Sequence, residues 1–316
     1  MHRTVPALAL TVVAGLLLAG CSSAGAEDGG IRVVASTNVY GQIAEAIGGD
    51  LIEVTSLISS VAQDPHAYEA SARDQLTISR ADLIVRNGGG YDSFVDGLIE
   101  ASDADAVVLT AVEFSHAYPG NDGHDAAGDH DHDGDASHDH IEGFNEHVWY
   151  DPHTIAHLAE DIAHELSEID AAHAGDYAEN LAGFQAGIED LETDLAAVAD
   201  AHAGDRVFVT EPVPVYLLEA AGIVDAAPTA FSEAVEEGQD VPPSTLLAAR
   251  DILDAGDVRA VVSNAQTGGA ETAEVLRWAE ADGIPVLEFT ELVPDGETYL
   301  AWMRANVADL AGTLTR

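Results

Sequence analysis

Lysine is absent from this chain of 316 residues, so its 11 basic residues are all arginine. Aspartate and glutamate together number 57, which leaves a formal net charge of −46. Such a surface would repel a polyanion, and we therefore exclude a nucleic-acid partner. The acid excess is typical of proteins that work at high salt, where screening weakens self-repulsion, and also of surfaces that attract cations.

Cysteine is nearly absent too, because Cys21 is the only one in the chain. A lone cysteine in an exported protein cannot form an internal disulfide. Cys21 follows an apolar run at 5–18 that is short for a transmembrane span, and the letters LAGC at 18–21 resemble the bacterial lipobox. We expect residues 1–20 to be a lipoprotein signal peptide, Cys21 to carry the lipid, and residues 21–30 to form a lipidated tether.

Long apolar runs are missing from the rest of the chain, so no other segment is expected to span a bilayer. About 296 residues remain after residue 20, enough for two lobes of ordinary domain size. The mature protein is therefore expected to be a soluble body on a lipid anchor. It would sit on the extracytoplasmic face of the cell membrane, in the periplasm or at the cell surface.

A tract rich in histidine and aspartate, at 116–140, contains almost nothing that could enter a core. Its histidines are His116, His124, His130, His132, His138 and His140. Imidazole and carboxylate groups bind borderline divalent metals such as zinc, and a flexible tract of both can chelate without folding. We expect an accessory metal-binding loop, with a solvated acidic spacer as the alternative.

Strand and helix patterns alternate along both halves of the chain. In the first half, strands are expected at 31–36, 52–58, 83–86 and 106–110, and helices from 38 to about 47, at 71–81 and at 152–169. In the second half, strands are expected at 206–210, 258–263 and 285–289, and helices at 215–221, 271–281 and 297–314. This alternation predicts parallel sheets with helices on their faces.

One periodic segment is much longer than the others and begins at residue 174. As a helix it would be about 40 Å long at 1.5 Å per residue. The fold class we predict is α/β, with two lobes that each hold a mostly parallel sheet flanked by helices, bridged by one long rigid helix. The predicted parts are an N-terminal lobe at 31–173, a linking helix at 174–203 and a C-terminal lobe at 204–316.

Four metal-binding side chains stand at or just beyond the ends of predicted strands. His66 lies in DPHAYE and His147 in NEHVWYDP, both in the first lobe. Glu211 follows a strand in VTEP and Glu291 follows one in FTE, both in the second lobe. Ligands of open α/β sheets bind beyond the carboxyl ends of the strands, so the four could converge between the lobes.

Several motifs occur together in this sequence, and between them they span essentially the whole mature chain. They are the lipobox, VAST at 34–37, DPHAYE at 64–69, a His-rich insertion before EHVWYDP at 146–152, the long central helix, VTEPVPVYLLEAAGI at 209–223, and FTE with YLAWMRANV up to residue 307. The combination of DPHxYE and HVWxDP is quite specific to one protein family. On these features the sequence resembles the solute-binding lipoproteins of bacterial zinc and manganese ABC importers.

The resemblance implies two α/β lobes bridged by one rigid helix, with the metal ion held between the lobes. The family's two ligand histidines match His66 and His147. Its third ligand, His in many zinc-type members and Glu in manganese-type members, matches Glu211. Its fourth ligand, usually Asp, matches Glu291, whose extra methylene departs from the pattern and leaves its denticity open.

The resemblance also implies a function. The protein would be a monomeric receptor rather than an enzyme, and would deliver its ion to an ABC permease driven by a cytoplasmic ATPase. Two imidazoles and two carboxylates suit a divalent cation. Glu211 favours manganese by the family pattern, whereas the His-rich tract and the general affinity order favour zinc. We expect Zn²⁺, with Mn²⁺ as the alternative.

Two other functions remain as alternatives. An extracellular metallohydrolase could use His66 and His147, although the chain has no HExxH or comparable motif. An adhesin-like surface lipoprotein is the other, although the sequence shows no adhesive module.

Some neighbouring residues have simpler interpretations. Asp151 is expected to cap the helix that follows it, with a role in orienting a metal ligand as the alternative. Glu236 and Glu237 are expected in a surface loop. Asn264 and Gln266 end a strand and are expected in a turn, with a hydrogen bond to a ligand as the alternative.

Overall fold

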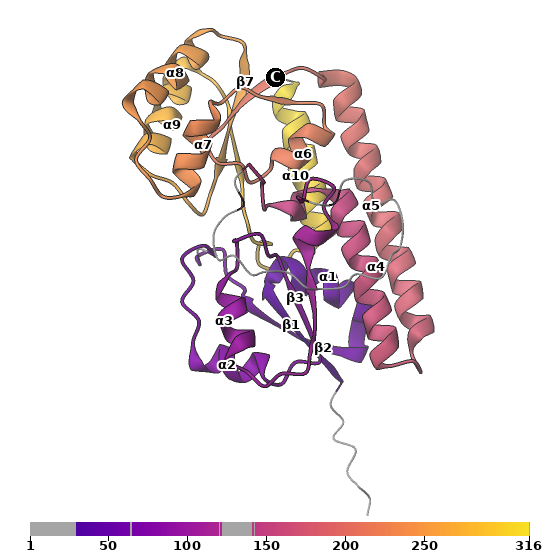
Figure 1. Ribbon diagram of the computed structural model, residues 1–316. Helices are drawn as coiled ribbons and strands as arrows, with labels where there is room; N and C mark the ends of the chain where they lie inside the picture. Colours follow the sequence, from indigo (N-terminus) through magenta and orange to yellow (C-terminus); the bar gives the residue numbers. More distant parts are fainter. Residues whose placement is uncertain (1–29, 64, 120, 122–140, 142, 316) are drawn as a thin grey trace, which may run out of the picture.

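The computed structural model describes residues 30–63, 65–119, 121, 141 and 143–315. Over these residues the chain forms two four-stranded sheets, and every neighbouring pair of strands in them is parallel. Helices flank both sheets, and one long helix, α5 (Ala174–His202), runs past both halves of the molecule (Figure 1). The predicted α/β class is confirmed.

The first sheet has the strand order β2-β1-β3-β4. Its elements are β1 (Ile31–Thr37), α1 (Asn38–Gly48), η1 (Gly49–Leu51), β2 (Ile52–Ile58), α2 (Ala72–Ile78), β3 (Leu83–Arg86), α3 (Phe94–Glu100), β4 (Val107–Thr110), η2 (Ala111–Phe114), η3 (Val148–Tyr150) and α4 (Pro152–Ile169). Along β1, Val33 and Ala35 pack into one hydrophobic core and Val34 into another. The strand is therefore buried on both faces, as the near-continuous apolar run of a parallel strand requires.

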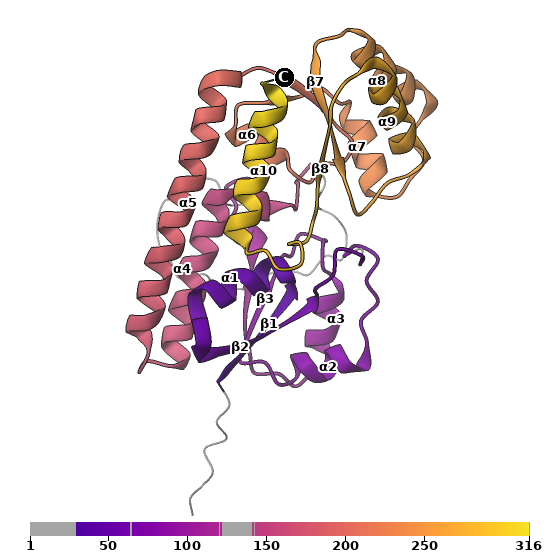
Figure 2. The ribbon, with the colours of Figure 1, turned by 180° about the vertical axis from the view of Figure 1, so that it is seen from behind.

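The second sheet repeats this arrangement with the order β6-β5-β7-β8. Its elements are β5 (Arg206–Val209), α6 (Val215–Ala220), β6 (Val224–Asp225), α7 (Thr229–Glu236), α8 (Pro243–Asp254), β7 (Val258–Asn264), α9 (Ala270–Asp282), β8 (Val286–Phe289) and α10 (Tyr299–Leu314). Seen from behind, α10 lies along α5 beside the second sheet (Figure 2).

One hydrophobic core joins the two halves through α5. The buried face of this helix contributes Tyr177, Phe184, Ile188, Leu191, Leu195 and Val198 to the core. The same core contains Ile43 of α1 in the first half and Leu217 of α6 in the second. Because its apolar residues recur at spacings of three and four, α5 presents a single stripe to both halves.

The expected surface loop at Glu236 and Glu237 is wrong for Glu236 but right for Glu237, which is exposed and follows the end of α7. Glu236 is the last residue of α7, and α8 begins seven residues later at Pro243. The prolines there suggested a loop, yet Pro243 occupies the first position of α8, where its missing N–H costs no hydrogen bond. The short helix α3 and the two-residue strand β6 were also missed, because such short elements leave little periodic signal.

Helix ends follow the local sequence. Asp151 caps α4 as expected, accepting a hydrogen bond from the backbone N–H of His153 at 3.2 Å. Ser71 and Asp74 form a reciprocal capping box at the start of α2. Within the described part of the chain, no helix has the length and apolar character needed to cross a membrane.

Candidate metal centre

Side chains beyond the carboxyl ends of strands in both sheets meet between the two halves. Tyr91, beyond β3, donates its hydroxyl hydrogen to Oε2 of Glu291, beyond β8, over 3.0 Å. Asn38, at the end of β1, donates from Nδ2 to the Val293 carbonyl at 2.7 Å and accepts from the Val293 N–H at 3.1 Å. Ligands of parallel sheets bind beyond the carboxyl ends of the strands, so a binding site is expected in this position.

His147 is fully buried in the segment that leads into η3. Its Nδ1 lies 2.7 Å from Oδ1 of Asn145, and its backbone N–H donates to the same oxygen at 3.1 Å. The amide nitrogen of Asn145 donates to the Pro212 carbonyl at 2.9 Å, which fixes the oxygen as the group facing His147. An oxygen can only accept, so the ring hydrogen is on Nδ1 and Nε2 carries the lone pair that could bind a metal ion.

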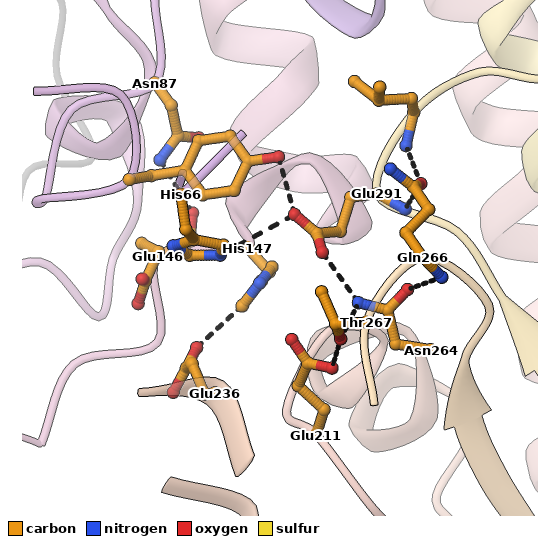
Figure 3. Close-up of polar contacts among 12 residues, drawn as sticks. His66, Asn87, Glu146, His147, Glu211, Glu236, Asn264, Gln266, Thr267 and Glu291 are labelled. Carbon is orange, nitrogen blue, oxygen red and sulfur yellow. Dashed lines mark hydrogen bonds and ion pairs between the residues drawn. The ribbon is translucent and has the colours of Figure 1, made fainter. Parts of the chain in front are cut away.

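His66 lies in the loop between β2 and α2. Its ring packs edge-on against Tyr91, with centroids 4.9 Å apart. Its Nε2 lies 3.7 Å from Oε2 of Glu291 (Figure 3). The histidine from the first half therefore faces a carboxylate from the second.

Glu291 is completely buried and is positioned by amide side chains of its own half. Asn264, at the end of β7, donates to Glu291 Oε1 at 2.7 Å. Gln266 accepts at its Oε1 from the backbone N–H groups of Glu291 and Leu292, at 2.7 and 3.1 Å. The two amides lie in the expected turn after β7, where the Gln266 N–H donates to Asn264 Oδ1 at 3.0 Å, and they also orient a candidate ligand residue.

The structure thus brings three of the four expected ligand residues together. One ligand atom each of His66, His147 and Glu291 lies within 4.8 Å of the others. We call these three residues the primary group. Two imidazoles and one carboxylate are a donor set that suits zinc or another borderline divalent cation.

Glu211 does not belong to the primary group by this distance, although it lies beside it. It is almost fully buried and accepts a hydrogen bond from the Thr267 hydroxyl (Figure 3). The pKa of Glu211 is raised to about 7, because the effect of burial outweighs the hydrogen bond from Thr267 and the charge of Glu291 adds to the rise. A metal ion would reverse this effect, because it favours the ionised carboxylate.

Two carboxylates near the primary group, the buried Glu146 and the partly buried Glu236, were not anticipated from the sequence. Ligand atoms of Glu146, His147 and Glu236 also lie within 4.8 Å of one another. Burial, followed by the charges of Glu146, Glu211 and Glu291, raises the pKa of Glu236 to about 9. Glu146 directly precedes the candidate ligand His147, so the sequence could have suggested it. Nothing in the local sequence indicates that Glu236, at the end of α7, lies near this site.

The accessory histidines can be compared with the structure only at one position. His116 is exposed, and its Nδ1 lies 3.7 Å from Oδ2 of Asp151. The other predicted accessory ligands and the lipidation site lie outside the described residues; they are His124, His130, His132, His138, His140 and Cys21.

Family comparison agrees with this architecture. The family model described as zinc-uptake complex component A, periplasmic, matches residues 33–313. The chain therefore belongs to this family. Its members are metal-binding, substrate-binding proteins of ABC transporters, which are not enzymes.

The names of individual relatives mention different metals. The iron ABC transporter substrate-binding lipoprotein MtsA of Streptococcus pyogenes serotype M1 is 25% identical over 328 residues, covering 95% of each chain. The manganese-binding lipoprotein MntA of Halalkalibacterium halodurans is 27% identical over 57% of this chain and 55% of its own. The zinc-bound structure of a variant of AdcAII from Streptococcus pneumoniae is 22% identical and shares the fold, with a TM-score of 0.69 over 90% of this chain and 98% of that one.

Proposed function

We propose that this protein is the extracytoplasmic zinc receptor of an ABC importer, and that it binds one ion through His66, His147, Glu211 and Glu291. The observation that carries the proposal is the primary group, in which ligand atoms from both halves lie within 4.8 Å of one another. The ion would be the cargo, delivered to a permease driven by a cytoplasmic ATPase. No ligand position has to stay open for a reacting water, which distinguishes a carrier from a metallohydrolase.

Zinc is proposed over manganese on the chemistry of the donors. Two imidazole nitrogens favour a borderline cation, and zinc binds more tightly than manganese to nitrogen and oxygen sites in general. The family description names zinc uptake, and the AdcAII relative was solved with zinc. The carboxylate at Glu211 favours manganese by family pattern, so competition between the two ions is the decisive comparison.

The remaining features of the mature chain fit the same function. We propose that lipid on Cys21 anchors the protein, that it acts as a monomer, and that the tract at 116–140 collects metal near the site. The proposed division into an N-terminal lobe at 31–173, a linking helix at 174–203 and a C-terminal lobe at 204–316 follows the two sheets and α5.

The test is metal analysis of the mature protein beside two histidine variants. His66→Ala removes a ligand of the primary group, whereas His164→Ala removes an exposed histidine on α4. We expect one tightly held zinc ion in the wild type and in His164→Ala. The His66→Ala variant should bind zinc at least about tenfold more weakly, because losing even a residue that only supports a metal ligand costs about that much affinity.

The metal is then decided by competition. Zinc that is retained in excess manganese supports a zinc receptor, and manganese that displaces it at one equivalent would change the cargo to manganese. Equal zinc binding by the wild type and His66→Ala would exclude the primary group as the site.

A further inference from the structure

A second set of potential ligands shares His147 with the primary group. Glu146, directly before it in the chain, is only 2% exposed. Glu236 comes from the second half, at the end of α7, and its Oε1 lies 3.6 Å from Nδ1 of His147 (Figure 3). We call Glu146, His147 and Glu236 the second group; like the primary group, it takes residues from both halves of the molecule.

The spacing of the second group suits a metal ion. Two ligand atoms that each lie about 2.1 Å from a tetrahedral zinc ion are about 3.4 Å apart. The separation of His147 Nδ1 and Glu236 Oε1 is 3.6 Å, and that of His66 Nε2 and Glu291 Oε2 is 3.7 Å. Small movements would therefore bring either pair to binding distance, provided that at the second pair Asn145 Oδ1, now 2.7 Å from His147 Nδ1, gives way to the ion.

The two carboxylates of the second group also suit a cation. The carboxylates of Glu146 and Glu236 approach within 4.8 Å of each other in a buried setting. Glu236 Oε1 is shielded from solvent and has no hydrogen-bond partner among the described residues. Two carboxylates this close in a medium of low dielectric constant can both be ionised only when a positive charge lies between them.

We propose that the region between the halves offers two positions to one divalent cation, the first in the primary group and the second in the second group. This inference rests on the proposed function as a metal receptor. A neutral imidazole has one lone pair, so His147 serves one position at a time. Nε2 serves the first position; the second requires the ring hydrogen to move to Nε2 and Nδ1 to exchange its contact with Asn145 Oδ1 for the ion. An ion could thus enter or leave in two steps while remaining bound at each step by residues from both halves.

The experiment locates zinc by anomalous scattering in crystals of the full mature chain. The His66→Ala variant removes a ligand of the primary group and leaves the second group complete. His66→Ala is then combined with Glu236→Gln or, as the matched control, with Glu237→Gln, which removes the same charge from the next, exposed residue. All variants keep the His-rich tract, so its contribution cancels when their zinc affinities are compared in solution.

We expect a zinc peak among Glu146, His147 and Glu236 in His66→Ala and in His66→Ala/Glu237→Gln. The peak should vanish in His66→Ala/Glu236→Gln, with a fall in zinc affinity of at least about tenfold. A peak that persists in that double variant, or no peak in His66→Ala at all, would overturn the second position. So would an affinity loss without any peak, because Glu236 would then act only by orienting His147.

These outcomes are distinct from failure of the proposed function. If wild-type crystals show zinc in the primary group while the second group never fills, the receptor function stands and only the second position is lost. If the wild type holds zinc in neither group, the receptor function itself fails.

Discussion

At the residue scale, the unusual feature is the cost of holding ionised carboxylates in the metal-free protein. The pKa of Glu211 is raised from 4.5 to about 7, mainly by burial. The folded, metal-free protein therefore binds this proton more tightly than the unfolded chain does. The contribution of the protonated Glu211 carboxyl group to folding stability is complete below about pH 4.5 and is lost as the pH rises through about 7.

Replacing Glu211 with glutamine should remove this dependence. Between pH 5 and pH 8, the free energy of unfolding of the metal-free wild type should fall by more than that of Glu211→Gln, by about 3 kcal/mol at most. Urea denaturation in the presence of a chelator measures the difference. Glu219→Gln, an exposed change on α6, should behave like the wild type. An identical pH profile in Glu211→Gln would contradict the burial argument.

At the scale of elements, α5 determines how the two halves depend on each other. Its apolar stripe belongs to the same core as α1 in the first half and α6 in the second. The helix packs against α1 and α4 in the first half and against α6 and α10 in the second. The molecule is therefore expected to unfold as one cooperative unit, despite having two sheets.

Shortening a buried side chain of α5 tests this cooperativity. Leu191 is fully buried, so Leu191→Ala should cost about 2–5 kcal/mol of unfolding free energy and shift a single transition. Circular dichroism and tryptophan fluorescence should report the same midpoint. Leu247→Ala is the control, because Leu247 on α8 is 68% exposed and its truncation should change little. Two separate transitions would mean that the halves fold independently.

At the scale of the whole molecule, hydrogen bonds cross between the halves at several places. Besides the Asn38–Val293 pair, the Tyr150 hydroxyl donates to the Thr290 carbonyl at 2.7 Å. The Tyr299 hydroxyl donates to the Trp149 carbonyl at 2.8 Å, and that of Tyr216 to the Asn145 carbonyl at 2.7 Å. With α5 and its shared core, these bonds oppose a wide hinge motion.

Metal binding should therefore change the overall shape very little. We expect the radius of gyration of the wild type from small-angle X-ray scattering to be the same, within error, with and without zinc. Asn38→Ala removes both bonds to Val293 and should enlarge any difference between the two states. A large contraction of the wild type on binding metal would instead indicate closure about a hinge.

Several features followed from the sequence alone, because they depend on residues close together in the chain. The apolar runs predicted the parallel strands, the three-and-four spacing predicted α5, and Asp151 predicted the start of α4. Histidines and glutamates just beyond strand ends predicted candidate ligands. Three of those four residues lie within 4.8 Å of one another.

Only the tertiary structure decided the immediate surroundings of the candidate ligands. The second group joins Glu146 and His147 to Glu236, the last residue of a helix in the other half. Asn264 reaches Glu291 from a different strand, and Thr267 reaches Glu211. Periodicity and capping report on a few neighbouring residues, whereas burial and charge at the site are set by segments far apart in the chain.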